Sequence, residues 1–283
     1  LNKKLKFVYD ENLNISKYKN LTELSLDKVS SVFLCVPDTE KLKLIKFLLK
    51  KKKHVLVEKP LILKKKDLHT IKKLRKNKYL VYTAYNHRFE PSIISLKKQI
   101  DQNFIGKIYS VNIFYGNGTS LVVKNSTWKD KGNGVLTDLG SHIIDTLMFL
   151  FPKKNFLYEI VEKNSFENKS FDHVVFKTTN TNIKIFCEAT LLSWKNDFYI
   201  DILGEHGSLH VRGLCKWGPS YLTQRKRKYP SGIPKEKIKK ISCDDPTWRK
   251  EHFHFEKIIK NPLTDDLLNK DIYIASQLEK LIK

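Results

Sequence analysis

The first ninety residues alternate short apolar runs with stretches in which apolar residues recur every three or four positions. The apolar runs predict strands at residues 5–9, 32–36, 54–57 and 79–85. The stretches between them predict amphipathic helices at residues 39–51 and 65–76. Continuous apolar strands that alternate with helices indicate parallel βαβ units, with both faces of the sheet covered. We therefore expect an α/β domain over residues 1–91.

The pattern changes after this point. A helix predicted at 92–101 leads into a series of strands with few helices between them, at residues 107–115, 156–162, 173–178, 183–191, 198–203 and 208–211. Turn-forming residues at 180–182 and 204–207 separate some of these strands. Consecutive strands with tight turns predict a largely antiparallel sheet. With closing helices at 247–260 and 266–282, residues 92–283 are expected to form a second, α+β domain.

The charge balance is strongly basic, with 53 Lys and Arg against 30 Asp and Glu and a net charge of +23. Such a balance raises the possibility of nucleic-acid binding. However, only six of the basic residues are Arg, the side chain that best forms forked contacts with phosphate and guanine, and the lysines are spread along nearly every segment. We therefore expect no nucleic-acid partner. The positive charge is nevertheless compatible with an attraction for anionic metabolites.

Two further features bound the class of protein. No run of about 18 uncharged apolar residues occurs, so no membrane partner is expected. The four cysteines are widely separated and form no C-x-x-C pair, which favours a reduced, cytoplasmic compartment.

Polar residues follow the predicted parallel strands, at the edge of the sheet where ligands bind. Asp10 ends the first strand and could accept hydrogen bonds from a ribose diol; a solvated strand end is an equally good interpretation. Lys59 follows the third strand and precedes Pro60, which restricts the local backbone. An ammonium held at this rim could bind a substrate oxygen, although Lys59 could also be one more surface lysine.

The segment Gly132–Asp145 carries the most chemistry. Asp138 and His142 are four residues apart, which places them on one face of a helix predicted to start near Thr137. A carboxylate beside an imidazole raises its basicity and orients it, as a general base requires, and Asp145 could support the ring from the other side. The alternatives are a capping Asp with an ordinary surface His, or two metal ligands. No second His or Cys lies at a useful spacing, so we expect no metal.

Four stretches together resemble the Gfo/Idh/MocA family of nicotinamide-dependent oxidoreductases. They are VFLCVPDTEKL from residue 32, HVLVEKPL from residue 54, AYNHRFEP from residue 84 and GNGVLTDLGSHIID from residue 132. The tail DPTWRKEHFHF, from residue 245, is similar to members that act on nucleotide sugars and polysaccharide precursors. The resemblance covers nearly the whole chain, with its motifs in the family's order.

The resemblance implies a Rossmann-like nucleotide-binding domain followed by a domain with a large, mainly antiparallel open sheet. The second domain would bind substrate and assemble a homodimer or homotetramer through its sheet. The implied reaction is hydride transfer between NAD(P) and a secondary alcohol of a sugar, cyclitol or nucleotide sugar. A catalytically inactive relative that binds a metabolite or serves as a scaffold is the alternative.

The resemblance also assigns roles to individual residues. It implies Lys59, Asp138 and His142 as the catalytic residues. The implied cofactor-binding residues are Asp10, Val36, Pro37, Glu58, Lys59, Asn86 and Arg88. The implied substrate-binding residues are Lys59, Arg88, Trp128, Asp138 and His142. Because Asp10 would repel a 2′-phosphate, NAD is expected rather than NADP.

One departure from the family concerns the phosphate-binding loop. The family opens with a strand, a G-x-G-x-x-G turn and a helix, and no such glycine pattern occurs in this sequence. Residues 1–10 resemble the second Rossmann strand, so we expect that about 30 residues of one β-α unit are missing upstream. The 283 residues alone would then bind NAD poorly and fold badly. Asn133 is a smaller departure, since the family often has a glycine there.

Overall fold

The structure is a computed structural model that describes residues 25–76, 78–126, 129–260 and 266–283. The chain divides into two compact units, one formed by Leu1–Ala84 with Glu251–Ile272 and the other by Tyr85–Lys250 with Tyr273–Lys283. We call them unit 1 and unit 2. Each unit therefore contains a segment from the C-terminal part of the chain.

Unit 1 contains a parallel sheet in the order β1-β2-β3, formed by β1 (Ser31–Leu34), β2 (His54–Glu58) and β3 (Val81–Ala84). The connecting helices are α1 (Asp38–Lys50) and α2 (Lys65–Arg75), and a short 3₁₀ helix, η2 (Leu26–Lys28), precedes β1. The parallel α/β architecture predicted from the sequence is confirmed, with most element ends within two residues of the prediction.

The core of unit 1 explains why these residues fold in this way. Val55 and Val57 of β2 are fully buried, as are Ile45 and Leu48 on one face of α1. A strand covered on both faces needs such a continuous apolar run.

A helix from the far end of the chain also contributes to unit 1. Phe255 of α6 (Thr247–Ile259) shares a buried cluster with Leu56, Leu80, Tyr82 and Ala84. Besides packing, the Tyr82 hydroxyl donates a hydrogen bond to a Glu251 carboxylate oxygen at 3.3 Å. The sheet therefore takes part of its cover from a segment about 170 residues away in the sequence.

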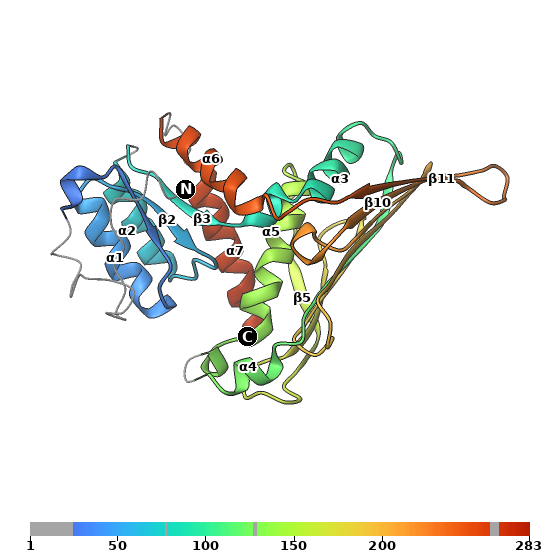
Figure 1. Ribbon diagram of the computed structural model, residues 1–283. Helices are drawn as coiled ribbons and strands as arrows, with labels where there is room; N and C mark the ends of the chain where they lie inside the picture. Colours follow the sequence, from blue (N-terminus) through green and yellow to red (C-terminus); the bar gives the residue numbers. More distant parts are fainter. Residues whose placement is uncertain (1–24, 77, 127–128, 261–265) are drawn as a thin grey trace. The chain divides into compact units, whose positions relative to one another are not determined.

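Unit 2 is built on an eight-stranded sheet in the order β11-β10-β9-β8-β4-β7-β6-β5 (Figure 1). Its strands are β4 (Ile108–Gly116), β5 (Tyr158–Asn164), β6 (His173–Thr178), β7 (Lys184–Thr190), β8 (Asp197–Gly204), β9 (Gly207–Arg212), β10 (Ser220–Lys226) and β11 (Lys235–Ile241). The β4–β7 pair is parallel, and the other neighbouring pairs are antiparallel. The predicted large, mainly antiparallel sheet is confirmed.

The two faces of this sheet differ in their surroundings. The helices α3 (Pro91–Asp101) and α5 (Ser141–Leu150) lie along one face, which we call the inner face (Figure 1). Alternate strand residues such as Ile113, Ile200 and Val211 are buried. The opposite, outer face carries exposed side chains, among them Phe186 and Ile238. This alternation is the period of two expected of strands.

Two strands and one α-helix of unit 2 were not predicted, as well as its short 3₁₀ helices: the strands are β10 and β11, and the helix is α4 (Ser120–Lys124). The sequence of β11, KEKIKKI, is exposed along almost its whole length and offers no apolar face to recognise. This strand therefore depends more on its hydrogen-bonded pairing with β10 than on the β propensity of its own residues.

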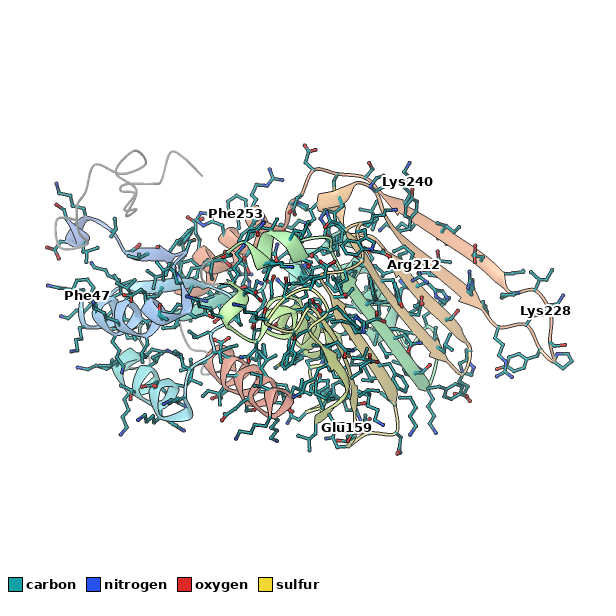
Figure 2. All side chains as sticks on the ribbon, turned by 90° about the horizontal axis from the view of Figure 1, so that it is seen from below. Phe47, Glu159, Arg212, Lys228, Lys240 and Phe253 are labelled. Atoms are coloured by element: carbon teal, nitrogen blue, oxygen red, sulfur yellow. The ribbon has the colours of Figure 1, made fainter. Side chains whose placement is uncertain are left out.

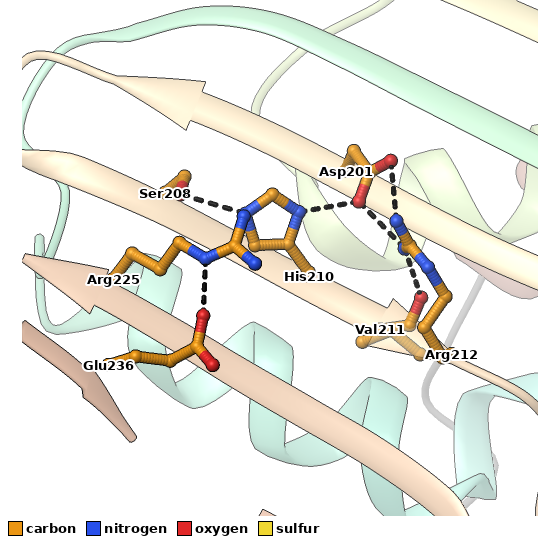
Figure 3. Close-up of polar contacts among 7 residues, drawn as sticks. All are labelled: Asp201, Ser208, His210, Val211, Arg212, Arg225 and Glu236. Atoms are coloured by element: carbon orange, nitrogen blue, oxygen red, sulfur yellow. Dashed lines mark hydrogen bonds and ion pairs between the residues drawn. The ribbon is translucent and has the colours of Figure 1, made fainter. Parts of the chain in front are cut away.

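The outer face carries a polar cluster on β8, β9 and β10, shown in Figure 3. His210 contacts Asp201 through Nδ1 at 2.6 Å and Ser208 through Nε2 at 2.8 Å. Arg212 also donates to Asp201 at 2.9 Å. Hydrogen bonds from His210 and Arg212 lower the pKa of Asp201, against the effect of its partial burial, which alone would raise that pKa.

No helix in the described parts of the chain is long and apolar enough to span a membrane.

Candidate active site

The histidine predicted to be catalytic lies where a π-helical turn enters a regular helix. The turn, η5 (Leu136–Gly140), contains Asp138, and His142 is the second residue of α5. Gly134 precedes this turn with φ +55°, and a Cβ there would lie 2.0 Å from the carbonyl oxygen of Phe171. Only glycine fits this close approach, which brings the Val135 N–H to 2.7 Å from the same oxygen.

His142 is buried, with 6% of its surface exposed, and its ring stacks on that of His87. The two ring centroids are 4.2 Å apart, with an interplanar angle of 22°. Tyr85 and Tyr115 approach the His142 ring edge-on, at 5.8 and 6.0 Å between centroids. The imidazole is therefore enclosed by aromatic rings from two segments of unit 2, residues 85–87 and β4, which fix its orientation.

Tyr115, near the end of β4, lies at the centre of this aromatic group. Its ring contacts His87, Phe198 and Trp217, with centroids 5.2 to 5.9 Å away. The Lys216 ammonium donates to the Tyr115 hydroxyl at 3.1 Å and lies 4.6 Å from the Trp217 ring centroid. Burial of Tyr115, and the nearby Asp138 carboxylate, raise the pKa of the tyrosine, so its hydroxyl is protonated at neutral pH.

Asp138 and His142 differ in exposure. Asp138 is exposed to solvent, whereas His142 is buried. The negative charge of Asp138 acts on Tyr115, which in turn contacts His142. An acidic side chain, an imidazole and a phenol are therefore gathered in one region of unit 2.

Asp145, which we expected to support the His142 ring, is paired with Arg88. The Arg88 Nε lies 2.8 Å from Asp145 Oδ2 and 3.0 Å from Oδ1, and its Nη2 also contacts Oδ1. Asp145 is fully buried, so this bidentate ion pair neutralises its carboxylate charge inside unit 2. The pair ties η3 (Asn86–Phe89) to α5, and thus holds His87 beside His142.

Contacts of two further side chains, Asn86 and Glu90, fix the segment that carries His87. The Asn86 amide donates to the Thr247 hydroxyl at 3.0 Å. The buried Glu90 carboxylate accepts from the Cys215 backbone N–H at 3.2 Å and from the Ser220 hydroxyl at 3.3 Å. Asn86 and Arg88, predicted as ligands of cofactor or substrate, therefore make contacts that hold η3 in place.

The predicted cofactor residues of unit 1 lie at the carboxyl ends of its strands. Val36 and Pro37 follow β1, Glu58 is the last residue of β2 and Lys59 comes next. The side chains of Glu58 and Lys59 are partly exposed. Carboxyl ends of parallel strands meet at one edge of a sheet, so the structure gathers these four residues at the edge where nucleotides bind in open α/β sheets.

The backbone beside Lys59 is held by a buried lysine. Lys41, on α1, is 2% exposed and donates to the Pro60 carbonyl oxygen at 2.9 Å. Its ammonium also lies 2.7 Å from the Asp38 carboxylate. This link from the start of α1 to the loop after β2 fixes the backbone that carries Glu58 and Lys59.

Two predicted site residues, Asp10 and Trp128, lie outside the described residues. Lys59 belongs to unit 1 and His142 to unit 2, so their convergence on one substrate stays a prediction.

Sequence reasoning missed several residues that the structure adds to the His142 region, among them His87, Tyr115, Lys216 and Trp217. His87 lies inside the Asn-x-Arg motif, and this position could have indicated that it belongs to the site. The other three come from β4 and from η6 (Cys215–Trp217), which are far from the motifs in sequence. Only the pairing of the strands shows that they belong together.

Comparisons with known proteins agree with this architecture. The model of the oxidoreductase family's NAD-binding Rossmann fold matches residues 2–86, and the model of its C-terminal alpha/beta domain matches residues 97–257. Among curated proteins, glucose-6-phosphate 3-dehydrogenase of Bacillus subtilis is 29% identical over 161 residues. This match covers 55% of the chain and 41% of the relative. The chain spans less than half the length of the curated relatives it matches first.

Solved structures share the fold. A 3-ketoreductase from Actinomadura kijaniata, in complex with TDP-benzene and NADP, matches with a TM-score of 0.74 at 15% identity, over 92% of this chain and 79% of its own. An oxidoreductase from Agrobacterium radiobacter, in complex with NAD+, L-tartaric acid and magnesium, has a TM-score of 0.74 at 14% identity, over 93% and 80% of the two chains. With both domain models matched in order, the chain belongs to the Gfo/Idh/MocA oxidoreductase family.

Proposed function

We propose that this protein transfers a hydride between a nicotinamide cofactor and a secondary alcohol of a sugar, cyclitol or nucleotide sugar. The observation that carries the proposal is the enclosed imidazole of His142, stacked on His87 in a family whose other domain binds NAD. Burial among rings gives the imidazole a fixed direction, which proton transfer requires. The names of the sugar dehydrogenase and the ketoreductase that resemble this chain support the choice of substrate class.

His142 is the proposed general base. In the oxidation direction it accepts the hydroxyl proton of the substrate, and Asp138 offsets the positive charge that the imidazole gains. Lys59 is proposed to donate a hydrogen bond to the same oxygen as it becomes a carbonyl oxygen. This pairing of Lys59 with His142 rests on the order of the motifs and on the chemistry of the two side chains.

The cofactor edge of unit 1 suits a dinucleotide. The partly exposed Glu58 carboxylate can accept hydrogen bonds from ribose hydroxyls, and Val36 and Pro37 follow β1 at the same edge. When bound, the nicotinamide ring would take up or release the hydride. We propose NAD rather than NADP, because Asp10 would repel a 2′-phosphate; the structural relatives include complexes of both kinds.

Substrate contacts are proposed for Lys59, Asp138 and His142, and for Arg88 and Trp128. The Arg88 guanidinium also binds Asp145, so besides the proposed substrate contact this residue holds η3 in place. Lys216 and Trp217 are further candidates, because an ammonium above an indole ring suits a sugar that carries an anionic group.

We also propose a homodimer or homotetramer that forms through the outer face of the unit 2 sheet, in the cytoplasm. This face exposes Phe186, Tyr221 and Ile238 beside the polar cluster around His210. Apolar side chains on an exposed sheet face, mixed with charged groups, are typical of association surfaces.

The test is a steady-state assay of protein expressed from its complete gene, with NAD or NADP and a panel of sugars, cyclitols and nucleotide sugars. We expect turnover with at least one secondary alcohol, and a loss of kcat of about 10²–10⁴-fold in each of Lys59→Met and His142→Asn. Circular dichroism would check that both variants fold.

Lys72→Met, on α2, provides the matched control for Lys59→Met and should keep full activity. Unchanged kcat in both site variants would remove the catalytic assignment. A protein that binds the metabolites but shows no turnover, whose ligand binding survives His142→Asn, would instead be an inactive relative.

A further inference from the structure

Unit 2 contains a pocket of about 200 Å³ that lies away from the His142 cluster. Helix α3 contributes Ser95, Lys98 and Gln99 to its lining, β10 contributes Leu222 and Gln224, and β11 contributes Lys237 and Lys239. The residues Ser95, Lys98 and Gln99 are spaced by three and four, so they share one face of α3. On the sheet, Lys237 pairs with Gln224 and Lys239 with Leu222, which places all four on the inner face.

The lining is rich in hydrogen-bond donors. Three ammonium groups, two side-chain amides and one hydroxyl surround a floor formed by the buried Leu222, and no Asp or Glu lines the pocket. Lys237 and Lys239 are two residues apart on one strand, so their Cα atoms are about 7 Å apart. Like charges this close repel each other, and an anion between them would remove that repulsion.

The neighbouring hairpin strengthens the positive field. From Arg225 to Lys240 the chain has eight basic residues and one acidic residue, Glu236, which contacts Arg225 at 2.5 Å. Figure 2 shows Lys228 at the far end of this hairpin and Lys240 on β11. A concave surface with one sign of charge concentrates the field, and thus attracts anions of opposite sign.

The size of the pocket limits the ligand. A volume of about 200 Å³ is below the range of about 300–1,000 Å³ that encloses a drug-sized molecule. The pocket therefore suits a compact, multiply charged group rather than a whole nucleotide. A diphosphate offers several acceptor oxygens and several negative charges, which match the donors and the positive charge of the lining.

We propose that the pocket between α3, β10 and β11, which we call the α3 pocket, binds a diphosphate group, either as inorganic diphosphate or as part of a nucleotide. Lys98, Lys237 and Lys239 supply the charge, and the Ser95, Gln99 and Gln224 side chains supply neutral hydrogen bonds. The Ser220 end of β10 binds Glu90 beside η3, whereas Leu222 and Gln224 lie two and four residues farther along the strand. The α3 pocket is thus separate from the proposed catalytic region.

The test is isothermal titration calorimetry with inorganic diphosphate on the full chain, at low and at physiological salt. The variant Lys98→Gln/Lys237→Gln/Lys239→Gln should bind at least tenfold more weakly than the unchanged protein. The control Lys153→Gln/Lys154→Gln/Lys195→Gln removes the same charge from exposed lysines outside the pocket and its hairpin, and should stay within about twofold. Thermal unfolding of both variants checks their fold.

A second arm repeats the titrations with ADP. If ADP binds more tightly than diphosphate and loses affinity in the pocket variant, the ligand is a nucleotide; if only diphosphate binding depends on the pocket lysines, the ligand is the free anion. The proposal is overturned if diphosphate does not bind, or if the control loses as much affinity as the pocket variant. Binding of a single-stranded oligonucleotide without binding of diphosphate or ADP would also overturn it.

Discussion

The two units place their candidate site residues in different ways. In unit 1 the residues at the sheet edge follow β1 and β2, which are neighbours both in sequence and in the sheet. In unit 2 the aromatic group around His142 draws on η3, β4, β8 and η6, and β4 lies between β7 and β8 in the sheet rather than beside β5, its neighbour in the chain. A site built from consecutive strands can be predicted from local sequence, whereas one closed by distant pairings cannot.

The two units also differ in the contacts that hold their candidate site residues in place. Unit 1 fixes its edge by short-range links, such as the one from Lys41 to the Pro60 carbonyl. Unit 2 depends on buried polar contacts between distant segments, above all Arg88 with Asp145 and Glu90 with Cys215. Buried polar contacts are costly to break, so the largest effects of single substitutions are expected in unit 2.

The sharpest test of this difference is Asp145→Asn. It leaves the half-buried Arg88 with a neutral partner, and we expect the free energy of unfolding to fall by about 3–5 kcal/mol, as measured by urea denaturation. Asp101→Asn removes the exposed partner of Lys97 and should cost no more than about 0.5 kcal/mol. Equal losses in the two variants would show that the buried pair does not hold η3 against α5.

In unit 1 a smaller effect is expected from His54→Leu. The His54 Nδ1 accepts the Leu80 N–H at 3.1 Å, so the change leaves a donor unpaired and should cost about 1–3 kcal/mol in urea denaturation at pH 7.5.

This histidine also predicts a pH dependence. Partial burial lowers the pKa of His54 below its ordinary value of 6.5, so the unfolded chain takes up the proton more readily than the folded one. Stability from this group is therefore present above pH 6.5 and declines as the pH falls below it. The decline between pH 7.5 and 5.5 should be smaller in His54→Leu, and His69→Gln on α2 serves as the control. A decline of the same size in His54→Leu would assign it to other groups.

The smallest effect is expected on the outer face, from Asp201→Asn. Because the pKa of Asp201 is lowered in the folded state, its contribution is present above its ordinary value of 3.8 and is lost as the pH falls below that value. The variant should lose about 0.5–1 kcal/mol at pH 7 and less at pH 3, measured by thermal or urea unfolding. Asp197→Asn, an exposed residue of the same strand, is the control. A loss at pH 3 as large as that at pH 7 would contradict the linkage.

Much of the fold could be predicted because buried positions appear in the sequence as apolar runs or as apolar residues at helical spacing. The apolar runs at β2 and β6 and the amphipathic pattern of α7 gave element ends within a residue of those observed. β10 and β11 show no clear apolar pattern, because lysine and arginine make up much of their exposed surface. For the site, the motifs predicted where His142 and Lys59 lie along the chain. The partners Tyr115 and Lys216 could not be found, because their proximity depends on strand pairing.

The lysine-rich β11 and the irregular β5 occupy the two edges of the large sheet, and this placement has a consequence for self-association. An uncovered edge offers unpaired backbone groups to any other chain, and natural sheets discourage such growth with charge or with bulges. Here four of the seven residues of β11 are lysines, while β5 carries a break in register between Ile160 and Glu162. Copies of this protein should therefore resist joining their sheets edge to edge into open fibres.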